Sequence, residues 1–354
     1  MYWPDRPWIL KNLRLSLRVH KVKKMEIKLP DAAVRQQVQQ AWREKLQGAS
    51  LGKLEDLVAN YAAMTGGVPA LLKPVMLLMC GDHGIAKYGV SAFPQEVTLQ
   101  MVNGYMRETA GANVLARHAG MDVVVVDVGT NFDLSGYKKV RQMKVARGTE
   151  DFTQGPAMTE EQARQALQVG LDLADEMIDK GCNLLATGEM GIANTTSTAA
   201  IAAAFLGLDP EETVGRGSGI NDERMAIKRQ VVRDGLARNN PLQGDGFDIL
   251  MKVGGYDHAG LAGMILGGAR RGVPTMLDGV NATAAALLAY GMAPACAKYM
   301  LCSHLSSDVS HKKMLATLGL EPIVDAGMRL GEGTGASLAI GLLRLALGTY
   351  QDLE

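Results

Sequence analysis

Two glycine-rich segments of the chain carry a carboxylate where a ligand could bind. In the first, residues 188–196, Glu189 lies between Gly188 and Gly191, and the polar residues 194–196 open an alanine-rich stretch. An apolar strand that ends in such a turn directs backbone N–H groups and the positive end of the next helix at one point, which suits a phosphate. A well-capped helix start would give the same pattern, and the segment is neither a Walker A loop nor a GxGxxG loop. Glu189 favours the ligand site, because a carboxylate has little structural reason to lie in that turn.

The second segment, residues 329–336, places Glu332 between Gly331 and Gly333 directly before an apolar helix. A carboxylate there could simply complement the helix dipole. Three glycines within five residues, however, cost backbone entropy that a plain cap does not require. We therefore expect a backbone packed against a ligand, with Glu332 facing it. In a pocket lined by Met and Leu the acid would have a raised pKa and could act as a general base.

Two further motifs have a chemical and a structural interpretation. Asp82 and His83 follow an apolar run and could serve as metal ligands or as an acid/base pair, but we favour a structural role in which His83 bonds to backbone. Residues 214–219 form a glycine-rich loop ahead of Lys228, which suits an anion, although a solvated loop is the ordinary alternative.

The remaining histidines predict no metal site. His304 and His311 lack the HExxH spacing, and the four cysteines form no zinc-like pattern with the histidines. His258 precedes an apolar stretch and is expected to cap a helix. We therefore predict no metal.

Short apolar runs that end in glycine-rich or polar turns alternate with helical patterns along the chain. The runs are residues 74–80, 123–126, 183–187, 273–277 and 298–302. Continuous apolar strands alternating with helices indicate a parallel sheet covered on both faces. The predicted fold class is α/β, a doubly wound, Rossmann-like sheet whose ligands bind at the carboxyl ends of the strands.

Helical patterns divide the chain into expected domains. Thr159 and Gln162 form a capping box ahead of a long helix that Gly181 ends. Residues 1–70 contain helices at 34–46 and 54–64 without strands, and we expect them to pack with a C-terminal helix at 336–347. The predicted division is residues 1–70 as an extension and helical segment, 71–335 as the large α/β domain, and 336–354 as the C-terminal helix.

Composition excludes several classes of function. The 354 residues carry 37 Lys and Arg against 37 Asp and Glu, so no global field favours nucleic acid or an anionic membrane. Two long uncharged runs, residues 190–208 and 279–297, are too polar to span a membrane and are expected to be buried helices. The cysteine pattern fits a reduced, cytoplasmic setting. The basic residues 1–24 lack the apolar core of a secretory signal.

Several segments, in order along the chain, resemble the nicotinate-nucleotide–dimethylbenzimidazole phosphoribosyltransferase family of cobamide biosynthesis. They are GDHG at 81–84, VVDVG at 125–129, GEMGIANTT at 188–196, VGRGSG at 214–219 and RLGEGTG at 329–335. The resemblance covers about residues 70–350 and implies a parallel sheet with a small helical domain built from both termini. It implies transfer of the 5-phosphoribosyl group of nicotinate mononucleotide to an aromatic base, with inversion and without a metal or organic cofactor.

The resemblance also assigns roles to single residues. The catalytic base of the family maps onto Glu332, its second active-site acid onto Glu189, and an active-site lysine onto Lys228. The acceptor pocket maps onto Phe93, Met101, Met190 and Leu330. We expect the phosphoribosyl group at the two glycine-rich turns, on Gly191, Ala193, Asn194, Thr195, Gly331 and Gly333.

The chain departs from the family pattern at two places. Phe93 and Met101 stand where relatives carry Ser and Gln, which removes hydrogen bonds to an azole and predicts an acceptor range that extends to phenol or p-cresol. Glu150 and Asp151 add negative charge that would oppose phosphate binding if their loop faced the site, or they lie at a subunit interface.

Three functional hypotheses follow. The first is an active transferase, as a homodimer or as a heterodimer with a paralogous subunit. The second is a weakly active or inactive partner subunit of such a heterodimer. A dinucleotide-dependent dehydrogenase is excluded, because no glycine-rich fingerprint is followed by an acid at the required spacing.

Overall fold

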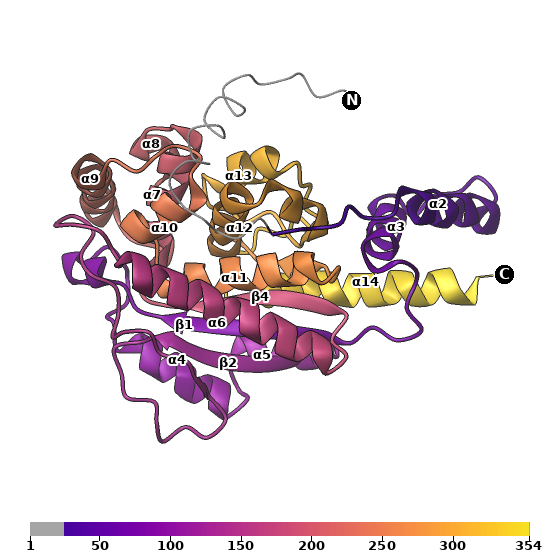
Figure 1. The fold of residues 1–354 in the computed structure, drawn as a ribbon, viewed down its shortest axis with the longest axis horizontal. Helices are drawn as coiled ribbons and strands as arrows, with labels where there is room; N and C mark the ends of the chain where they lie inside the picture. The colour runs from indigo at the N-terminus through magenta and orange to yellow at the C-terminus, as the bar shows by residue number, and fades with distance from the viewer. Residues whose placement is uncertain (1–24, 354) are drawn as a thin grey trace.

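The computed structural model describes residues 25–353. The basic segment at 1–24, for which the sequence assigned no role, lies outside the described residues. Within the described part the chain forms one six-stranded sheet with helices on both faces (Figure 1).

All strands of the sheet are parallel, in the order β3-β2-β1-β4-β5-β6. Their bounds are β1 Pro74–Gly81, β2 Asp122–Gly129, β3 Arg141–Gln142, β4 Leu184–Met190, β5 Thr275–Leu277 and β6 Met300–Cys302. The α/β, Rossmann-like fold class is confirmed. Five of the six strands were predicted, and β3 was not, because two residues carry no readable pattern. Residues 298–299 belong to a 3₁₀ helix and not, as predicted, to β6.

Helices make up the rest of the regular structure in the described residues. They are α2 Ala32–Leu46, α3 Lys53–Thr65, α4 Val97–Met106, α5 Gly111–His118, α6 Glu160–Asp179, α7 Asn194–Leu206, α8 Pro210–Thr213, α9 Asp222–Asn239, α10 Gly246–Val253, α11 Tyr256–Arg270, α12 Val280–Met292, α13 His311–Leu318 and α14 Thr334–Asp352, with 3₁₀ helices η1 Gly84–Tyr88 and η2 Pro294–Tyr299.

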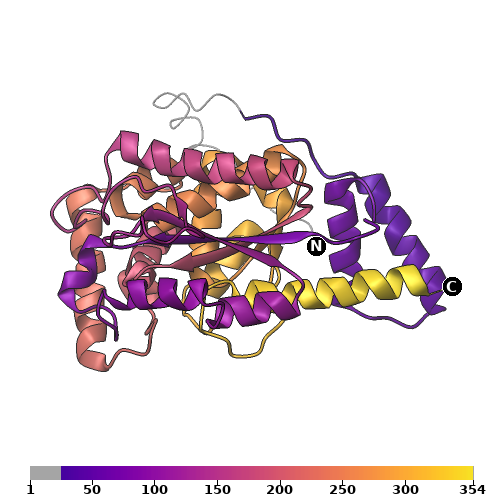
Figure 2. The ribbon, with the colours of Figure 1, turned by 90° about the horizontal axis from the view of Figure 1, so that it is seen from below.

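The sheet separates two hydrophobic cores, and Figure 2 shows the helix layers on either side of it. Along β1, Leu77 and Met79 point into a core formed with α6, α7, α10, α11 and α12. The alternate residues Met76, Leu78 and Cys80 point into a core formed with α2, α3, α4, α5 and α14. The two-residue period of a strand that is buried on both faces therefore explains the continuous apolar runs.

Local signals explain where several helices begin and end. The capping box predicted at Thr159 is present: its side chain accepts from Gln162 N, and the Gln162 side chain accepts from Thr159 N. Gly181 follows α6 in a left-handed conformation, with φ +93°. The two uncharged runs form α7 and α12, both largely buried. In the described part of the chain, no helix is both long and apolar enough to cross a membrane.

The two terminal helical segments lie side by side at one end of the molecule (Figures 1 and 2). The Trp42 ring of α2 packs edge-on against Tyr350 of α14, with ring centroids 5.1 Å apart. Helix α14 starts two residues earlier than predicted and extends to Asp352. The predicted division into domains at residues 70 and 335 stays a prediction.

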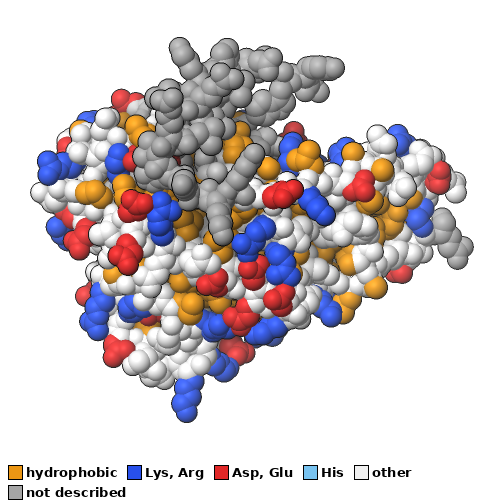
Figure 3. Space-filling view, viewed as in Figure 1, with side chains coloured by type: hydrophobic (Ala, Val, Ile, Leu, Met, Phe, Trp, Pro, Cys, Tyr) orange, Lys and Arg blue, Asp and Glu red, His pale blue; other side chains and the backbone are white. Residues whose placement is uncertain are grey.

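On the face drawn in Figure 3, Lys and Arg side chains are interspersed with Asp and Glu side chains. This mixture agrees with the equal counts of the two charge types in the sequence. Elsewhere in the described residues, opposite charges form surface pairs, such as Arg271 with Asp179.

Candidate active site

The two carboxylates singled out in the sequence meet at the carboxyl edge of the sheet. Glu189 is the sixth residue of the seven-residue strand β4, and Glu332 lies in the turn before α14. The two segments touch, because a Cβ added to Gly331 would lie 2.9 Å from Glu189 Oε1. Residues that are 143 positions apart in the sequence (332 less 189) therefore form one site.

Glu189 is buried and held by amide side chains. Asn194, the first residue of α7, donates through Nδ2 to Glu189 Oε2, and Asn281 also hydrogen-bonds to the carboxylate. Burial raises the pKa of Glu189 to about 8, and the charges of Asp257 and Asp278 act in the same direction. Because the hydrogen bonds from the two amides offset only part of this rise, Glu189 is mostly protonated at neutral pH.

Glu332 occupies a strained turn. Its φ is +60°, between Gly331 at +81° and Gly333 at +79°, a region that residues with a side chain rarely adopt. Its atom Oε2 is buried without a hydrogen-bond partner. Burial raises the pKa of Glu332; interaction with the Tyr105 hydroxyl opposes this rise, and the charge of Asp278 adds to it. A buried, unpaired carboxylate oxygen with a raised pKa suits proton abstraction from a bound molecule.

Lys228 of α9 lies beside the first turn of α7. Its ammonium group is fully buried and donates to Thr195 Oγ1 at 2.9 Å and to the Gly215 carbonyl at 3.0 Å. Burial lowers the pKa of Lys228 to about 8, although the charge of Asp308 opposes the change. The loop predicted to bind an anion covers this lysine, since a Cβ on Gly217 would lie 3.3 Å from Nζ.

The turn before α7 requires small residues. A Cβ on Gly191 would lie 1.9 Å from the Gly81 carbonyl oxygen, so no other residue fits against β1. Ala193 has a φ of +78°, and Ile192 N donates to Thr98 Oγ1 of α4 at 3.3 Å. The turn is therefore fixed between β1 and α4, and the Thr195 side chain in the first turn of α7 accepts from Lys228.

The residues predicted to line the acceptor pocket have different exposures. Met190 is buried and Met101 is half-buried, whereas Phe93 and Leu330 are 52% and 62% exposed. Met101 lies one helical turn from Tyr105, whose hydroxyl interacts with Glu332. Met101 therefore faces the same region as the carboxylates.

The loops that carry Ala92, Ser218 and Arg329 lie close to one another. Ala92 N donates to Ser218 Oγ at 2.9 Å, and a Cβ on Gly219 would lie 3.6 Å from an Arg329 nitrogen. The segment that carries Phe93 and the segment that carries Leu330 are thus joined through the glycine-rich loop.

Comparisons with known proteins agree with this geometry. A family model described as phosphoribosyltransferase matches residues 27–354. The relatives named nicotinate-nucleotide–dimethylbenzimidazole phosphoribosyltransferase include one from Chloroflexus aggregans, 49% identical over 305 residues, which cover 86% of this chain and 86% of the relative. Another, from Geobacter sulfurreducens, is 48% identical over 86% of this chain and 87% of its own length.

The chain belongs to the nicotinate-nucleotide–dimethylbenzimidazole phosphoribosyltransferase family. It is therefore an enzyme, and the family predicted from the sequence motifs is confirmed. The crystal structure of CobT from Thermus thermophilus superposes with a TM-score of 0.83 at 41% identity, over 89% of this chain and 96% of that chain.

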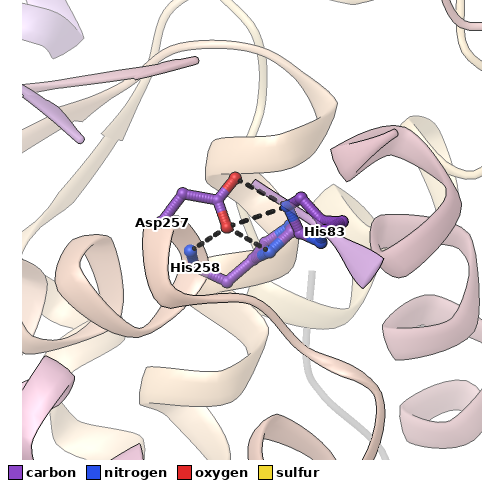
Figure 4. A group of neighbouring side chains, drawn as sticks. All are labelled: His83, Asp257 and His258. Atoms are coloured by element: carbon purple, nitrogen blue, oxygen red, sulfur yellow. Dashed lines mark hydrogen bonds and ion pairs between the residues drawn. The ribbon is translucent and has the colours of Figure 1, made fainter. Parts of the chain in front are cut away.

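Behind the site of this phosphoribosyltransferase lies a buried group of His83, Asp257 and His258 (Figure 4). His83 Nδ1 lies 3.0 Å from Ser197 Oγ and its Nε2 3.2 Å from Asp257 Oδ1. His258 Nδ1 lies 3.1 Å from Asp257 Oδ1, and its Nε2 lies 2.9 Å from Thr198 Oγ1.

Two predictions for this group were wrong in detail. His83 bonds to side chains and not to backbone, and His258 lies inside α11 instead of capping it. The three residues are the one group of this kind in the described part of the chain that could hold a metal ion. Burial alone would raise the pKa of Asp257, but the two imidazoles hold it well below its usual range. Asp257 Oδ2 also lies 3.4 Å from Asn194 Nδ2, so the group supports the amide that holds Glu189.

The extra acids at 150–151 do not act together. Asp151 is almost buried and pairs with Lys87 at 2.9 Å, and it accepts from Tyr88 Oη at 2.7 Å. Glu150 is exposed. Because Lys87 balances Asp151, this acid opposes phosphate binding less than the sequence alone suggests.

Sequence reasoning assigned no role to three residues that the fold brings to this phosphoribosyltransferase site. Tyr105 faces Glu332, Asn281 holds Glu189, and Asp278 bonds to the backbone of residues 333–336. Asp278 follows the apolar run of β5 at the carboxyl edge of the sheet. That position is the signal by which it could have been found.

Proposed function

We propose that the enzyme transfers the 5-phosphoribosyl group of nicotinate mononucleotide to an aromatic acceptor, giving an α-ribotide and nicotinate for cobamide biosynthesis. The observation that carries this proposal is the contact between the end of β4 and the turn before α14: Glu189 lies against Gly331, the neighbour of Glu332, and Glu332 carries an unpaired carboxylate oxygen. Family membership supports the reaction class.

Lys228 and the start of α7 would hold the phosphate. The buried ammonium and the first-turn N–H groups concentrate positive charge at one point, and Thr195 lies between them. Gly191, Ala193 and Asn194 shape the turn that opens toward this point. Gly331 and Gly333 would approach the ribose, although the Gly333 N–H is already bonded to Asp278 at 3.1 Å.

The proposed chemistry needs only positioning and one proton transfer. The bond between C1′ and the pyridinium nitrogen breaks, and its electron pair returns to nicotinate. The acceptor attacks C1′ from the opposite face, which inverts the anomeric configuration, and its proton passes to Glu332. Glu189, mostly protonated at neutral pH, would donate a hydrogen bond and would not act as the base. No metal or organic cofactor takes part in this scheme.

The acceptor pocket favours flat apolar molecules. Phe93, Met101, Met190 and Leu330 offer aromatic, thioether and aliphatic surface but no hydrogen-bonding side chain. Neither Phe93 nor Met101 can bond the far edge of a benzimidazole, whereas a phenol needs a partner only at its hydroxyl. We therefore propose that the acceptor range includes phenol and p-cresol besides 5,6-dimethylbenzimidazole.

We further propose that this chain has transferase activity of its own, whether it forms a homodimer or a heterodimer with a paralogous subunit. The proposal is supported by the presence in the sequence of the three residues with proposed roles, Glu189, Lys228 and Glu332, and by the pairing of Asp151 with Lys87, which removes one reason to expect an inactive partner subunit.

A direct assay tests the proposal. The purified chain is incubated alone with nicotinate mononucleotide and either 5,6-dimethylbenzimidazole or phenol, and nicotinate and the ribotide are measured by mass spectrometry. We expect product with both acceptors and at least a tenfold loss in Lys228→Met, which shows that the activity belongs to this site. Product with the benzimidazole alone would overturn the phenolic acceptor range. No product with either acceptor would overturn activity of the single chain and favour the partner-subunit alternative.

A further inference from the structure

The helix that follows Glu332 lacks a cap of its own. Gly333 occupies the N-cap position of α14, and no side chain caps the helix from within its own segment. A side chain at this position has no room, because a Cβ on Gly333 would lie 2.3 Å from Met76 Cε and 3.0 Å from the Thr187 carbonyl oxygen. The first N–H groups of α14 must therefore be satisfied by another part of the chain.

Asp278, which follows β5, supplies this cap from a distant point in the sequence. Its Oδ1 accepts from Gly335 N at 2.8 Å and from Ala336 N at 3.0 Å, and its Oδ2 accepts from Gly333 N at 3.1 Å. The carboxylate is 1% exposed. A buried acid that accepts three backbone N–H groups forms a strong, rigid contact at a positive helix end.

Asp278 is itself fixed to the sheet. Its backbone N donates to Thr187 Oγ1 of β4 at 2.8 Å, and its carbonyl oxygen accepts from Ser303 Oγ after β6 at 3.0 Å. Asp278 thus connects the ends of β4, β5 and β6 to the turn that carries Glu332.

The turn needs this support, because three successive residues, 331–333, have positive φ values and Glu332 is not a glycine. For a residue with a side chain such a conformation is strained, and it persists only where the surroundings enforce it. Thr334 adds two local contacts, donating to the Gly331 carbonyl through N at 3.1 Å and through Oγ1 at 2.7 Å. The bonds to Asp278 lie on the other side of Glu332.

We propose that Asp278 is a positioning residue for the reaction: by accepting the N–H groups of Gly333, Gly335 and Ala336, it holds the left-handed turn that aims the Glu332 carboxylate at the acceptor. The inference rests on the proposed function, since it assigns Asp278 a role through Glu332. The buried negative charge of Asp278 also raises the pKa of Glu332. The other titratable groups around this turn are Tyr105 of α4, Glu189 of β4, and His304, whose ring packs against Gly335.

The test compares Asp278→Asn with the wild type in the transferase assay as a function of pH. The asparagine keeps one oxygen for Gly335 and Ala336, but its amide cannot accept from Gly333, and the charge is lost. We expect kcat to fall at least tenfold, the KM for nicotinate mononucleotide to stay within twofold, and the acid midpoint of kcat to move to lower pH. The KM is expected to stay nearly constant because the variant does not alter Lys228 or Thr195, which are proposed to bind the phosphate.

A matched control separates positioning from stability. Asp245 caps α10 by accepting from Phe247 N and Asp248 N, and α10 carries no proposed site residue. Asp245→Asn should lower the Tm but leave kcat and its acid midpoint unchanged. If Asp278→Asn fails to fold, Asp278→Ser, a shorter neutral cap, is measured in the same way.

The outcomes are distinguishable. A wild type without transferase activity would contradict the proposed function. An active wild type with unchanged kcat and acid midpoint in the Asp278 variant would overturn the positioning role. A lower Tm of the Asp278 variant with an unchanged acid midpoint of kcat would show that Asp278 acts only as a structural cap of α14.

Discussion

A Cβ added to Gly331 would lie only 2.9 Å from Oε1 of Glu189. This proximity joins the end of β4 to the turn before α14 and brings two carboxylates with raised pKa values into one site. The absence of a side chain at residue 331 is what lets them meet. Gly331 thus allows a close approach to Glu189, while the predicted packing of this backbone against a ligand stays a prediction.

The pKa of Lys228 predicts how donor binding depends on pH. Burial lowers it to about 8, so the ammonium loses its proton above pH 8 and phosphate binding weakens there. We expect the KM for nicotinate mononucleotide to rise by up to about tenfold per pH unit above pH 8. In Lys228→Met the KM should be at least tenfold higher and flat between pH 7 and 9. Lys252→Met, which alters a lysine paired with Asp248, should behave as the wild type. A flat wild-type profile would exclude Lys228 as the phosphate-binding cation.

The raised pKa of Glu189 predicts a stability cost that grows with pH. The pKa of Glu189 is about 8 in the folded state and 4.5 ordinarily, so folding takes up a proton between these pH values. The free energy of folding that this proton uptake contributes is lost as the pH rises from 4.5 through 8. Each tenfold change in proton affinity is worth about 1.4 kcal/mol. We therefore expect the free energy of unfolding, measured with urea at pH 5, 6.5 and 8, to fall for the wild type relative to Glu189→Gln. The difference between the two proteins should change by a few kcal/mol over this range. Glu161→Gln, at an exposed acid of α6, should track the wild type; parallel curves for Glu189→Gln would contradict burial of this carboxyl.

How much of this site the sequence predicts depends on the range of the signal. Glu189 and Glu332 were found because glycines flank them locally, and the capping box at Thr159 was found because its partner is three residues away. Asp278 lies 55 residues before Gly333 in the chain, and His83 lies 174 residues before Asp257. No local sequence pattern predicts such pairs. They become visible only once the order of the strands in the sheet, which brings the carboxyl ends of the strands together, is known.

One correction and one open question illustrate the same limit. The direct neighbours of His258 suggested a cap, but Thr198 and Asp257 make it part of a buried hydrogen-bonded group. The charge of Asp151 would oppose phosphate binding only if its loop faced the site, and the sequence did not show that Lys87 pairs with it. In both cases the role depends on a residue from another segment that packs against it. Sequence periodicity does not identify such tertiary contacts.

The acceptor pocket predicts a change in specificity. Phe93→Ser with Met101→Gln restores polar side chains at two positions, so hydrogen bonds to an azole become possible. We expect the ratio of kcat/KM for 5,6-dimethylbenzimidazole over phenol to rise at least tenfold. Leu242→Ser, at another exposed apolar residue, should leave the ratio unchanged. An unchanged ratio in the double variant would separate these two residues from acceptor choice.

The group of His83, Asp257 and His258 predicts insensitivity to chelators. Each ring nitrogen lies within 3.3 Å of a hydroxyl or carboxylate oxygen of the protein, and His258 Nδ1, which makes no hydrogen bond, still pairs with Asp257, so the two histidines have protein partners in place of an ion. Dialysis against EDTA should change neither Tm nor kcat, whereas Asp257→Asn should lower the Tm by several degrees with or without EDTA. One equivalent of tightly bound metal, whose removal lowers the Tm, would instead establish a metal site.

Glu332 is proposed to remove the acceptor's proton, and the variant Glu332→Gln tests this role. The glutamine keeps the size of the side chain but cannot accept a proton at neutral pH. We predict that kcat falls about 10²–10⁴-fold, while the Kd for nicotinate mononucleotide, measured by calorimetry, stays within threefold of the wild-type value. Near-normal turnover by Glu332→Gln would contradict the assignment of Glu332 as the base.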